Sequence, residues 1–330
     1  MITPLGISAA LPAAGSAVRA AQSRWLAMFC GRAPWSADGE SLHLPAAVAG
    51  ETARLVTMEL AGTVSGSARA AYLQAQLAPV LASMRRQCEL AAALGTLVLK
   101  PYVDCQRVAV DYVQPQNFIP TAMNSRGEIT GAVFMEHVQK GRRYYTRLEQ
   151  HTLTQAGYTV QNTAYVSAGQ GSLGTPVPLA AVDEWSSLAS EYSITCADGS
   201  APAHPLFAVF TMPFANHVDT ASPLGVSVYS RAENLIEQAD RQYGRILWEY
   251  EGAELAIDAS VGALQTDGAD YTLPRTKRRL FRQLALDGGA GGDLYSVYSP
   301  AIRDASLFNG LNQLLRRAGH GNARLPAATR

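Results

Sequence analysis

The sequence predicts an α+β protein in which helical and β-rich segments succeed one another along the chain. Three observations predict this class: apolar residues at helical spacing in the first hundred residues, a run of alternating strands after them, and a long amphipathic helix near the middle. At 330 residues the chain is long enough for two or more subdomains. We expect six parts, namely a helical part at 1–100, a β-rich part at 101–229, a long helix at 230–261, a small mixed module at 262–302, a further helix at 303–317 and a tail at 318–330.

The first hundred residues predict three helices. Residues 16–30 form a short amphipathic segment, and ETARLVTMELAG places Leu55, Val56 and Leu60 on adjacent turns. A longer helix is expected from about 68 to 94. Pro79 lies inside it and should kink it or break it in two, because proline lacks the backbone N–H that a helix interior uses.

After Gly95 the period changes to that of strands. The β-branched and aromatic segments are separated by turns such as Asn124-Ser125-Arg126-Gly127, so we expect an antiparallel meander with a strand every dozen or so residues. AVDEWSSLA should form one or two helical turns, and 193–206 a loop. The predicted strands are LVLKPYV, QRVAVDYV, EITGAVFMEH, RRYYTRLEQHTL, YTVQNTAYVS and, after the loop, LFAVFTMP.

The long helix begins at a predicted capping box, in which Ser230 precedes Glu233 by three residues. If it extends to Ile257 it has about 28 residues and is roughly 40 Å long. Its apolar stripe consists of Leu235, Ile236, Ala239, Tyr243, Ile246, Leu247 and Tyr250. Its charged face consists of Glu233, Glu237, Asp240, Arg241, Arg245 and Glu249, with i,i+4 pairs at Glu237–Arg241 and Arg245–Glu249.

Gly244 and Trp248 interrupt that charged face. A glycine inside a helix costs about 1 kcal/mol relative to alanine, and an exposed tryptophan favours association. Together they predict a second packing surface, where another helix approaches at Gly244 and covers Trp248. The alternative is a core helix with one partly exposed tryptophan. The next amphipathic helix is expected to start at Ser299-Pro300, with a stripe of Leu307, Phe308, Leu311, Leu314 and Leu315.

Composition argues against several classes of protein. Basic and acidic residues balance at 27 each, so no overall charge attracts the chain to nucleic acid or to an anionic membrane. Cys30, Cys88, Cys105 and Cys196 form no CxxC pair, and we expect four buried thiols in a reducing cytoplasm rather than disulfides or a metal site. Neither a signal peptide nor an uninterrupted apolar span is recognisable, so we expect no membrane anchor.

The motifs do not indicate catalysis. GQGSLG at 169–174 matches GxGxxG, but prolines follow where a helix must begin, so we interpret it as a loop. Phosphate-loop and GxSxG motifs are missing, the six histidines are never three or four residues apart, and we see no acid/base pair. We therefore expect no enzyme, cofactor or metal. One basic cluster could contact phosphates or an acidic partner, or be a solvated loop: Arg275, Lys277, Arg278, Arg279 and Arg282.

Several stretches, in order and with small gaps, nevertheless resemble the portal proteins of long-tailed bacteriophages over most of 45–317. They are ETARLVTMEL, VDYVQPQNFIPTAMNSRGEITGAVF, YYTRLEQHTL, YTVQNTAY, LGTPVPLAAVDEW, FANHVDTASPLGVSVYSRAENLIEQADRQYGRILWEYE and YSPAIRDASLFNGLNQLLRR. The resemblance implies a structural subunit of a ring, generally of twelve copies, at one capsid vertex of the virion, assembled in the host cytoplasm. It implies contacts with the terminase large subunit, the head–tail connector and capsid proteins, and a channel that double-stranded DNA crosses with weak, non-specific binding.

Carried over to this chain, 1–100 and the meander to about Ala221 resemble the wing, and 230–257 resembles a stem helix. The segment 262–302 resembles the clip, and 299–317 resembles a returning stem helix. Family members continue after NQLLRR into further helices, whereas this chain has AGHGNARLPAATR. We therefore expect a C-terminally truncated portal chain, from a shortened or degraded prophage gene. The alternative is another phage structural protein, a minor capsid or connector component without a DNA channel.

Overall fold

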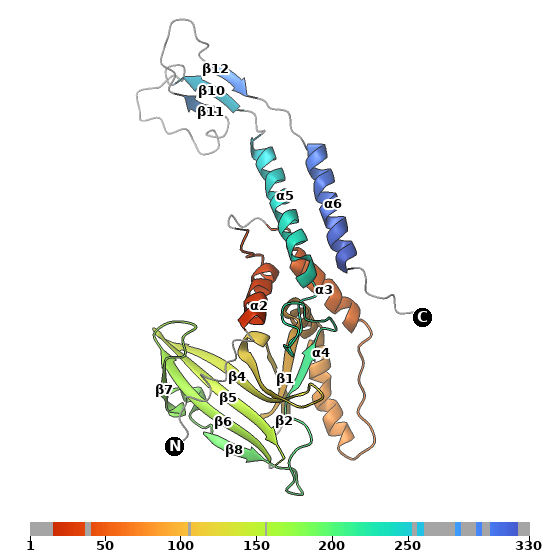
Figure 1. Cartoon of the computed structure of the whole chain (residues 1–330), viewed down its shortest axis with the longest axis vertical. Coiled ribbons are helices and arrows are strands. Elements are labelled where there is room, and N and C mark those ends of the chain that lie inside the picture. Colours follow the sequence, from red (N-terminus) through yellow and green to blue (C-terminus); the bar gives the residue numbers. More distant parts are fainter. Residues whose placement is uncertain are drawn as a thin grey trace. The chain divides into compact units, whose positions relative to one another are not determined.

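The computed structural model describes residues 16–36, 41–104, 107–155, 157–252, 256–260, 281–284, 295–298 and 304–322 (Figure 1). Helices and antiparallel sheets are both present, which confirms the α+β class. The chain divides into two compact units. The first unit contains the chain up to 34 and residues 43–231, and the second contains 35–42 and the chain from 232 onward.

Three helices of the first unit precede its sheets, as the sequence predicts. They are α2 (Ser16–Phe29), α3 (Leu44–Thr57) and α4 (Ala70–Leu94). α4 continues through Pro79 without a break. Because Pro79 is exposed, water can bond the carbonyl group that its missing N–H leaves unpaired. Gly95 ends α4 in the left-handed conformation at φ 81°, and its amide donates to the Ala91 carbonyl at 2.7 Å.

The predicted meander forms two antiparallel sheets rather than one. The smaller sheet has the order β2-β1-β9, with β1 (Thr96–Asp104), β2 (Arg107–Val113) and β9 (Ala208–Thr211). The larger has the order β3-β4-β5-β6-β7, with β8 also paired to β6. Its strands are β3 (Phe118–Met123), β4 (Ile129–Lys140), β5 (Arg143–Thr154), β6 (Gly157–Ser167), β7 (Thr175–Val177) and β8 (Glu191–Ile194).

Some details of this region differ from the predictions. β3 and β7 were not predicted, and β8 takes the first two residues of the expected loop at 193–206. AVDEWSSLA contains one short 3₁₀ turn, Asp183–Trp185, and a second one, Leu179–Ala181, ends at its first residue. β7 and β8, with three and four residues, contain too few alternating positions for a periodic signal.

The main core of the first unit lies where residues from both sheets and α2 meet. Phe118, Phe134 and Phe207 are its centre, with ring centroids 5.4 to 6.0 Å apart. In the β4–β5 register, Phe134 lies opposite Glu149 and Ala132 lies opposite His151. Because alternate residues share a face, this register places Glu149 and His151 beside the aromatic core.

The second unit contains α5 (Glu233–Gly252), a three-stranded sheet and α6 (Asp304–Asn322). In the sheet, β10 (Ala256–Ser260) pairs in parallel with β11 (Phe281–Leu284) and antiparallel with β12 (Tyr295–Tyr298). In Figure 1, α5 precedes β10, and α6 returns after β12 alongside α5, so the two helices lie antiparallel.

Three helix boundaries in this part of the chain correct the predictions. The long helix ends at Gly252, a poor helix former, and Ile257 belongs to β10. At its start, Ser230 lies in a 3₁₀ turn and its hydroxyl donates to the Ser227 carbonyl at 2.6 Å, so α5 begins at Glu233. The described part of the last helix starts at Asp304, and it continues to Asn322 through part of the expected tail. The glycine-rich stretch at 287–293 lies outside the described residues.

Candidate functional site

Apolar packing and a hydrogen bond between side chain and backbone connect α5 and α6. Ile246 and Leu311 are buried, on α5 and α6 respectively. The Gln242 side-chain amide donates to the Leu307 carbonyl at 3.3 Å, and the rings of Tyr250 and Phe308 lie 6.4 Å apart. These contacts use the apolar stripes that the sequence predicts for both helices.

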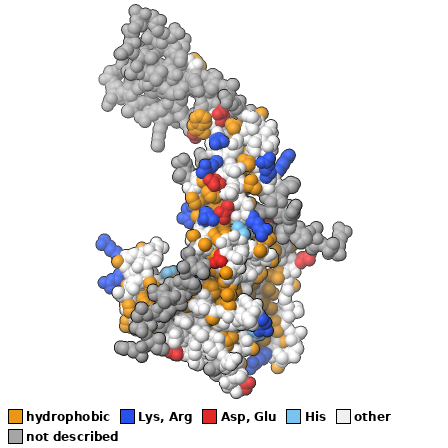
Figure 2. Space-filling view, viewed as in Figure 1, with side chains coloured by type: hydrophobic (Ala, Val, Ile, Leu, Met, Phe, Trp, Pro, Cys, Tyr) orange, Lys and Arg blue, Asp and Glu red, His pale blue; other side chains and the backbone are white. Residues whose placement is uncertain are grey.

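Trp248 projects from α5 with 69% of its surface exposed, whereas Gly244, one turn earlier, is half-buried. The predicted pair between Glu237 and Arg241 is present at 2.6 Å. Around these helices, Figure 2 shows acidic and basic side chains interspersed with hydrophobic ones on the visible face. A large aromatic side chain on a mixed polar surface is typical of a protein contact. The role of Gly244 and Trp248 as a subunit contact stays a prediction.

Asp240 does not lie on the exposed charged face, which corrects the sequence prediction. It is only 4% exposed. One carboxylate oxygen accepts the Trp35 indole N–H at 3.0 Å, and the other accepts the Leu42 amide at 2.9 Å. This carboxylate therefore attaches both ends of the segment 35–42 to α5 within the second unit. The donors come from about 200 residues earlier in the chain, so helical periodicity gives no sign of them.

The predicted basic cluster falls largely outside the described residues. Arg275, Lys277, Arg278 and Arg279 lie there, and Arg282 is placed only by its backbone in β11, opposite Asp258 of β10. Its contact with terminase or DNA stays a prediction.

A buried charge network in the first unit was not predicted. Glu149 is 8% exposed. One of its carboxylate oxygens accepts a hydrogen bond from the Lys100 ammonium group at 2.8 Å and lies 3.2 Å from the Arg147 guanidinium group. Arg147 also donates to Glu136 at 2.7 Å and to the side-chain oxygen Oδ1 of Asn162 at 3.0 Å. Lys100 comes from the smaller sheet and Glu149 from the larger, so the network joins the two sheets.

The carboxylate of Glu149 stays ionised because of these neighbours. Burial by itself raises the pKa of a carboxyl group, but here the hydrogen bond from His151 and the charges of the basic neighbours outweigh it. The pKa of Glu149 falls to about 2 as a result.

Glu149 also belongs to a chain of hydrogen bonds with the connectivity of a catalytic triad. The His151 Nε2 atom lies 2.8 Å from its second oxygen, and Nδ1 lies 2.6 Å from the Tyr158 hydroxyl. That hydroxyl also accepts the Leu206 amide at 3.2 Å. Since an ionised carboxylate only accepts, Nε2 carries a proton, and in the neutral imidazole the Tyr158 hydroxyl donates to Nδ1.

This triad-like chain is closed to substrates. Tyr158 is fully buried and His151 is 4% exposed. Burial raises the pKa of Tyr158 to about 12, so its phenol stays protonated. A nucleophile needs space beside it for the reacting atom of a substrate. The Tyr158 hydroxyl instead forms hydrogen bonds with the Leu206 amide and the His151 ring. We conclude that the network holds the sheets together.

The structure also tests the predictions for the GQGSLG segment and for the cysteines. GQGSLG forms a loop followed by β7 rather than by a helix, as predicted. Cys30 and Cys196 are exposed, which contradicts the prediction of four buried thiols; both are free, as is the half-buried Cys88. Cys105 lies outside the described residues. Within the described residues, we find neither a His, Cys, Asp and Glu cluster suited to a metal ion nor a helix long and apolar enough to span a membrane.

None of the known protein families compared with this sequence matches it, and neither does any curated protein.

Proposed function

We propose that this chain is a portal subunit, which forms a ring at a phage capsid vertex and surrounds the path of the viral DNA. The observation that carries the proposal is the arrangement of the second unit. A helix, a small sheet and a helix that returns antiparallel follow the α+β first unit. This is the order of wing, stem, clip and returning stem that the sequence resemblance implies. The terminase large subunit, the connector and capsid proteins are its proposed partners.

The exposed Trp248 side chain provides apolar surface that a neighbouring copy could bury, which would favour assembly of a ring. Burying a tryptophan side chain removes about 150 Å² or more from water, which contributes roughly 4 kcal/mol at 25 cal/mol per Å². In a closed ring, each copy makes this contact with a different surface of the next copy, so the contribution recurs at every interface. An exposed tryptophan at 69% therefore supports a role in contacts between copies.

Trp248→Ala should shift the protein from rings toward monomers while the monomer stays folded. Native mass spectrometry and electron microscopy measure the assembly, and circular dichroism measures the fold. Tyr102→Ala is the matched control, because Tyr102 is an aromatic residue 49% exposed in the first unit. A wild-type chain that is monomeric at high concentration would contradict the ring, and unfolding of Trp248→Ala would make Trp248 a core residue.

Combined replacement of Arg278 and Arg279 by alanine should weaken capture of the terminase large subunit and leave thermal stability unchanged. Positive charges at a contact with a partner contribute to encounter and orientation rather than to folding. Pull-down with purified terminase at two salt concentrations measures the effect. The matched control replaces Arg142 and Arg143, an arginine pair in the first unit. Equal capture by both double variants would contradict the assignment.

A further inference from the structure

The C-terminal part of α3 and the residues directly after it present large apolar side chains to solvent. Leu55, Val56, Met58 and Leu60 are between 45% and 63% exposed. The reason is the way α3 packs, because Ala49 and Ala53 form its buried stripe. Small residues therefore face the core and large apolar residues face outward, which is the reverse of an ordinary amphipathic helix. We call these four exposed residues the α3 patch.

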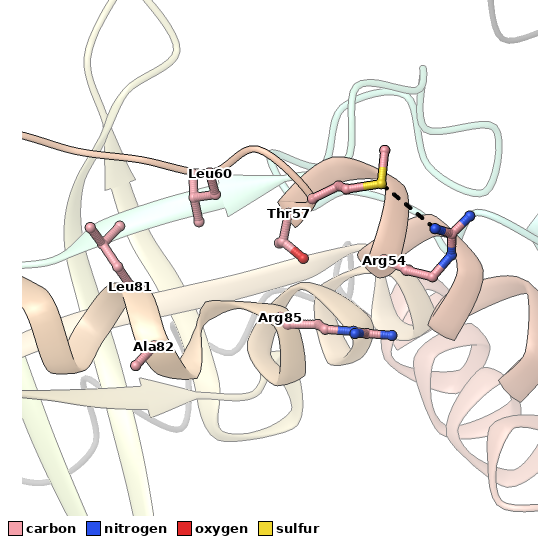
Figure 3. Close-up of a pocket in the computed structure, with 7 residues that line it drawn as sticks. Arg54, Thr57, Leu60, Leu81, Ala82 and Arg85 are labelled. Atoms are coloured by element: carbon pink, nitrogen blue, oxygen red, sulfur yellow. Dashed lines mark hydrogen bonds between the residues drawn. The ribbon is translucent and has the colours of Figure 1, made fainter.

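A groove lies beside this patch, between α3 and α4. Its volume is about 470 Å³, and its apolar wall includes Met58, Leu60, Leu81 and Ala82 (Figure 3). Leu81 and Ala82 come from α4, and Leu60 comes from the segment that follows α3. A groove of this size accommodates one or two apolar side chains of a partner.

The polar wall of the same groove is positively charged. Arg54 and Arg85 both line it. Arg54 donates two hydrogen bonds to Glu51, at 2.7 and 2.8 Å, and also contacts the sulfur of Met58 at 3.7 Å. Within the described residues Arg85 forms no ion pair. Glu51 therefore neutralises Arg54, and Arg85 leaves one positive charge on the wall of the groove.

We propose that the α3 patch and its groove bind an acidic amphipathic segment of another protein, with apolar side chains in the groove and a carboxylate on Arg85. Charge complementarity selects this occupant. A symmetric contact between two copies of the patch would bring the arginines of both copies together, and like charges at an interface are unfavourable. Nucleic acid would place charged phosphates against four large apolar side chains. The phosphates would lose their hydration there without gaining polar partners, which is unfavourable. The proposal concerns a surface of the first unit and does not depend on ring formation.

The test uses the full chain and two fluorescein-labelled peptides of about 18 residues, enough for five helical turns. One peptide has leucines on one face and glutamates on the other, and the second has lysine at every glutamate position. Fluorescence anisotropy should show saturable binding of the glutamate peptide. Arg85→Glu and Met58→Asp should each weaken it at least about tenfold, because one removes the charge pair and the other the apolar contact.

Val103→Asp and Arg126→Glu are the matched controls, because Val103 is 76% exposed and the Arg126 side chain is 73% exposed at other places in the first unit. Both should bind the glutamate peptide like the wild type. Since the patch side chains are exposed, unfolding midpoints of all variants should stay close to that of the wild type. Equal binding of the lysine peptide, or failure of the glutamate peptide to bind, would overturn the proposal. So would a change in oligomer size in Met58→Asp, since a second copy would then cover the patch.

Discussion

Glu149→Gln should lower the free energy of unfolding by about 3 to 5 kcal/mol, the usual cost of removing one partner of a buried ion pair. The amide keeps the shape of the side chain but carries no charge, so Lys100 stays buried without its counter-ion. Urea denaturation followed by circular dichroism measures the loss. The structural reason is that Glu149 lies 2.8 Å from both Lys100 and His151, and within the described residues no other carboxylate pairs with Lys100.

Glu136→Gln is the matched control, because Glu136 shares the Arg147 guanidinium but its side chain is 47% exposed. An exposed pair contributes little, so this variant should lose less than about 1 kcal/mol. A second comparison separates charge from shape. The double variant Lys100→Met with Glu149→Leu should be more stable than Glu149→Leu alone, since no unpaired ammonium remains. Equal losses in Glu149→Gln and Glu136→Gln would show that the network does not stabilise the fold.

The same prediction has a pH dependence. The pKa of Glu149 is about 2 in the folded protein against an ordinary value of 4.5. A lowered folded pKa stabilises the protein above the unfolded pKa, so the contribution is complete above about pH 4.5 and is lost as the pH falls toward 2. The difference corresponds to about 3 kcal/mol. Unfolding free energies between pH 5 and pH 2 should therefore fall more steeply for the wild type than for Glu149→Gln, and parallel curves would contradict the assignment.

Periodicity predicted the helices and the strands β1, β2, β4, β5, β6 and β9 because one face of each element is buried. It placed α4 and β4 to β6 to within a few residues. It placed the end of α5 too late, because Tyr250 and Ile257 share a helical face while Gly252, which ends the helix, has no side chain to break the pattern. The sequence therefore predicted a stem-like helix that reaches Ile257. The structure has a shorter helix, because β10 begins at Ala256.

The charge network could not be predicted as a whole, because Lys100 and Glu149 meet across two sheets that the sequence merges into one meander. Part of the signal was present. Arg147, Glu149 and His151 alternate along one strand and so share a face, and three ionisable side chains on a buried face require partners. The sequence also gives no sign of the α3 patch, because large apolar residues at helical spacing usually face a core, whereas here Ala49 and Ala53 are buried instead.

Asp240→Ala should detach the segment 35–42 from α5 and lower the free energy of unfolding of the second unit by about 3 kcal/mol. Each hydrogen bond to a charged group contributes about 1.5 kcal/mol or more, and this carboxylate accepts two of them. Alanine leaves the Trp35 indole N–H and the Leu42 amide without their acceptor. Hydrogen exchange at the Leu42 amide, followed by mass spectrometry, should become faster, and urea denaturation should show the loss of stability.

Asp240→Asn distinguishes this role from a general effect of charge. Its side chain has one oxygen and one NH₂ group, so it can accept from only one of the two donors and places a donor against the other. The loss of stability should therefore lie between those of wild type and Asp240→Ala. Glu237→Ala, one turn earlier on α5, removes a partner of the largely exposed Arg241 and should cost less than about 1 kcal/mol. If Asp240→Ala and Glu237→Ala behaved alike, the carboxylate of Asp240 would not hold the segment. The expected order of increasing loss of stability is Glu237→Ala, Asp240→Asn and Asp240→Ala. This order would mean that α5 is stabilised by a segment some 200 residues earlier in the chain, because both donors to Asp240 come from that segment.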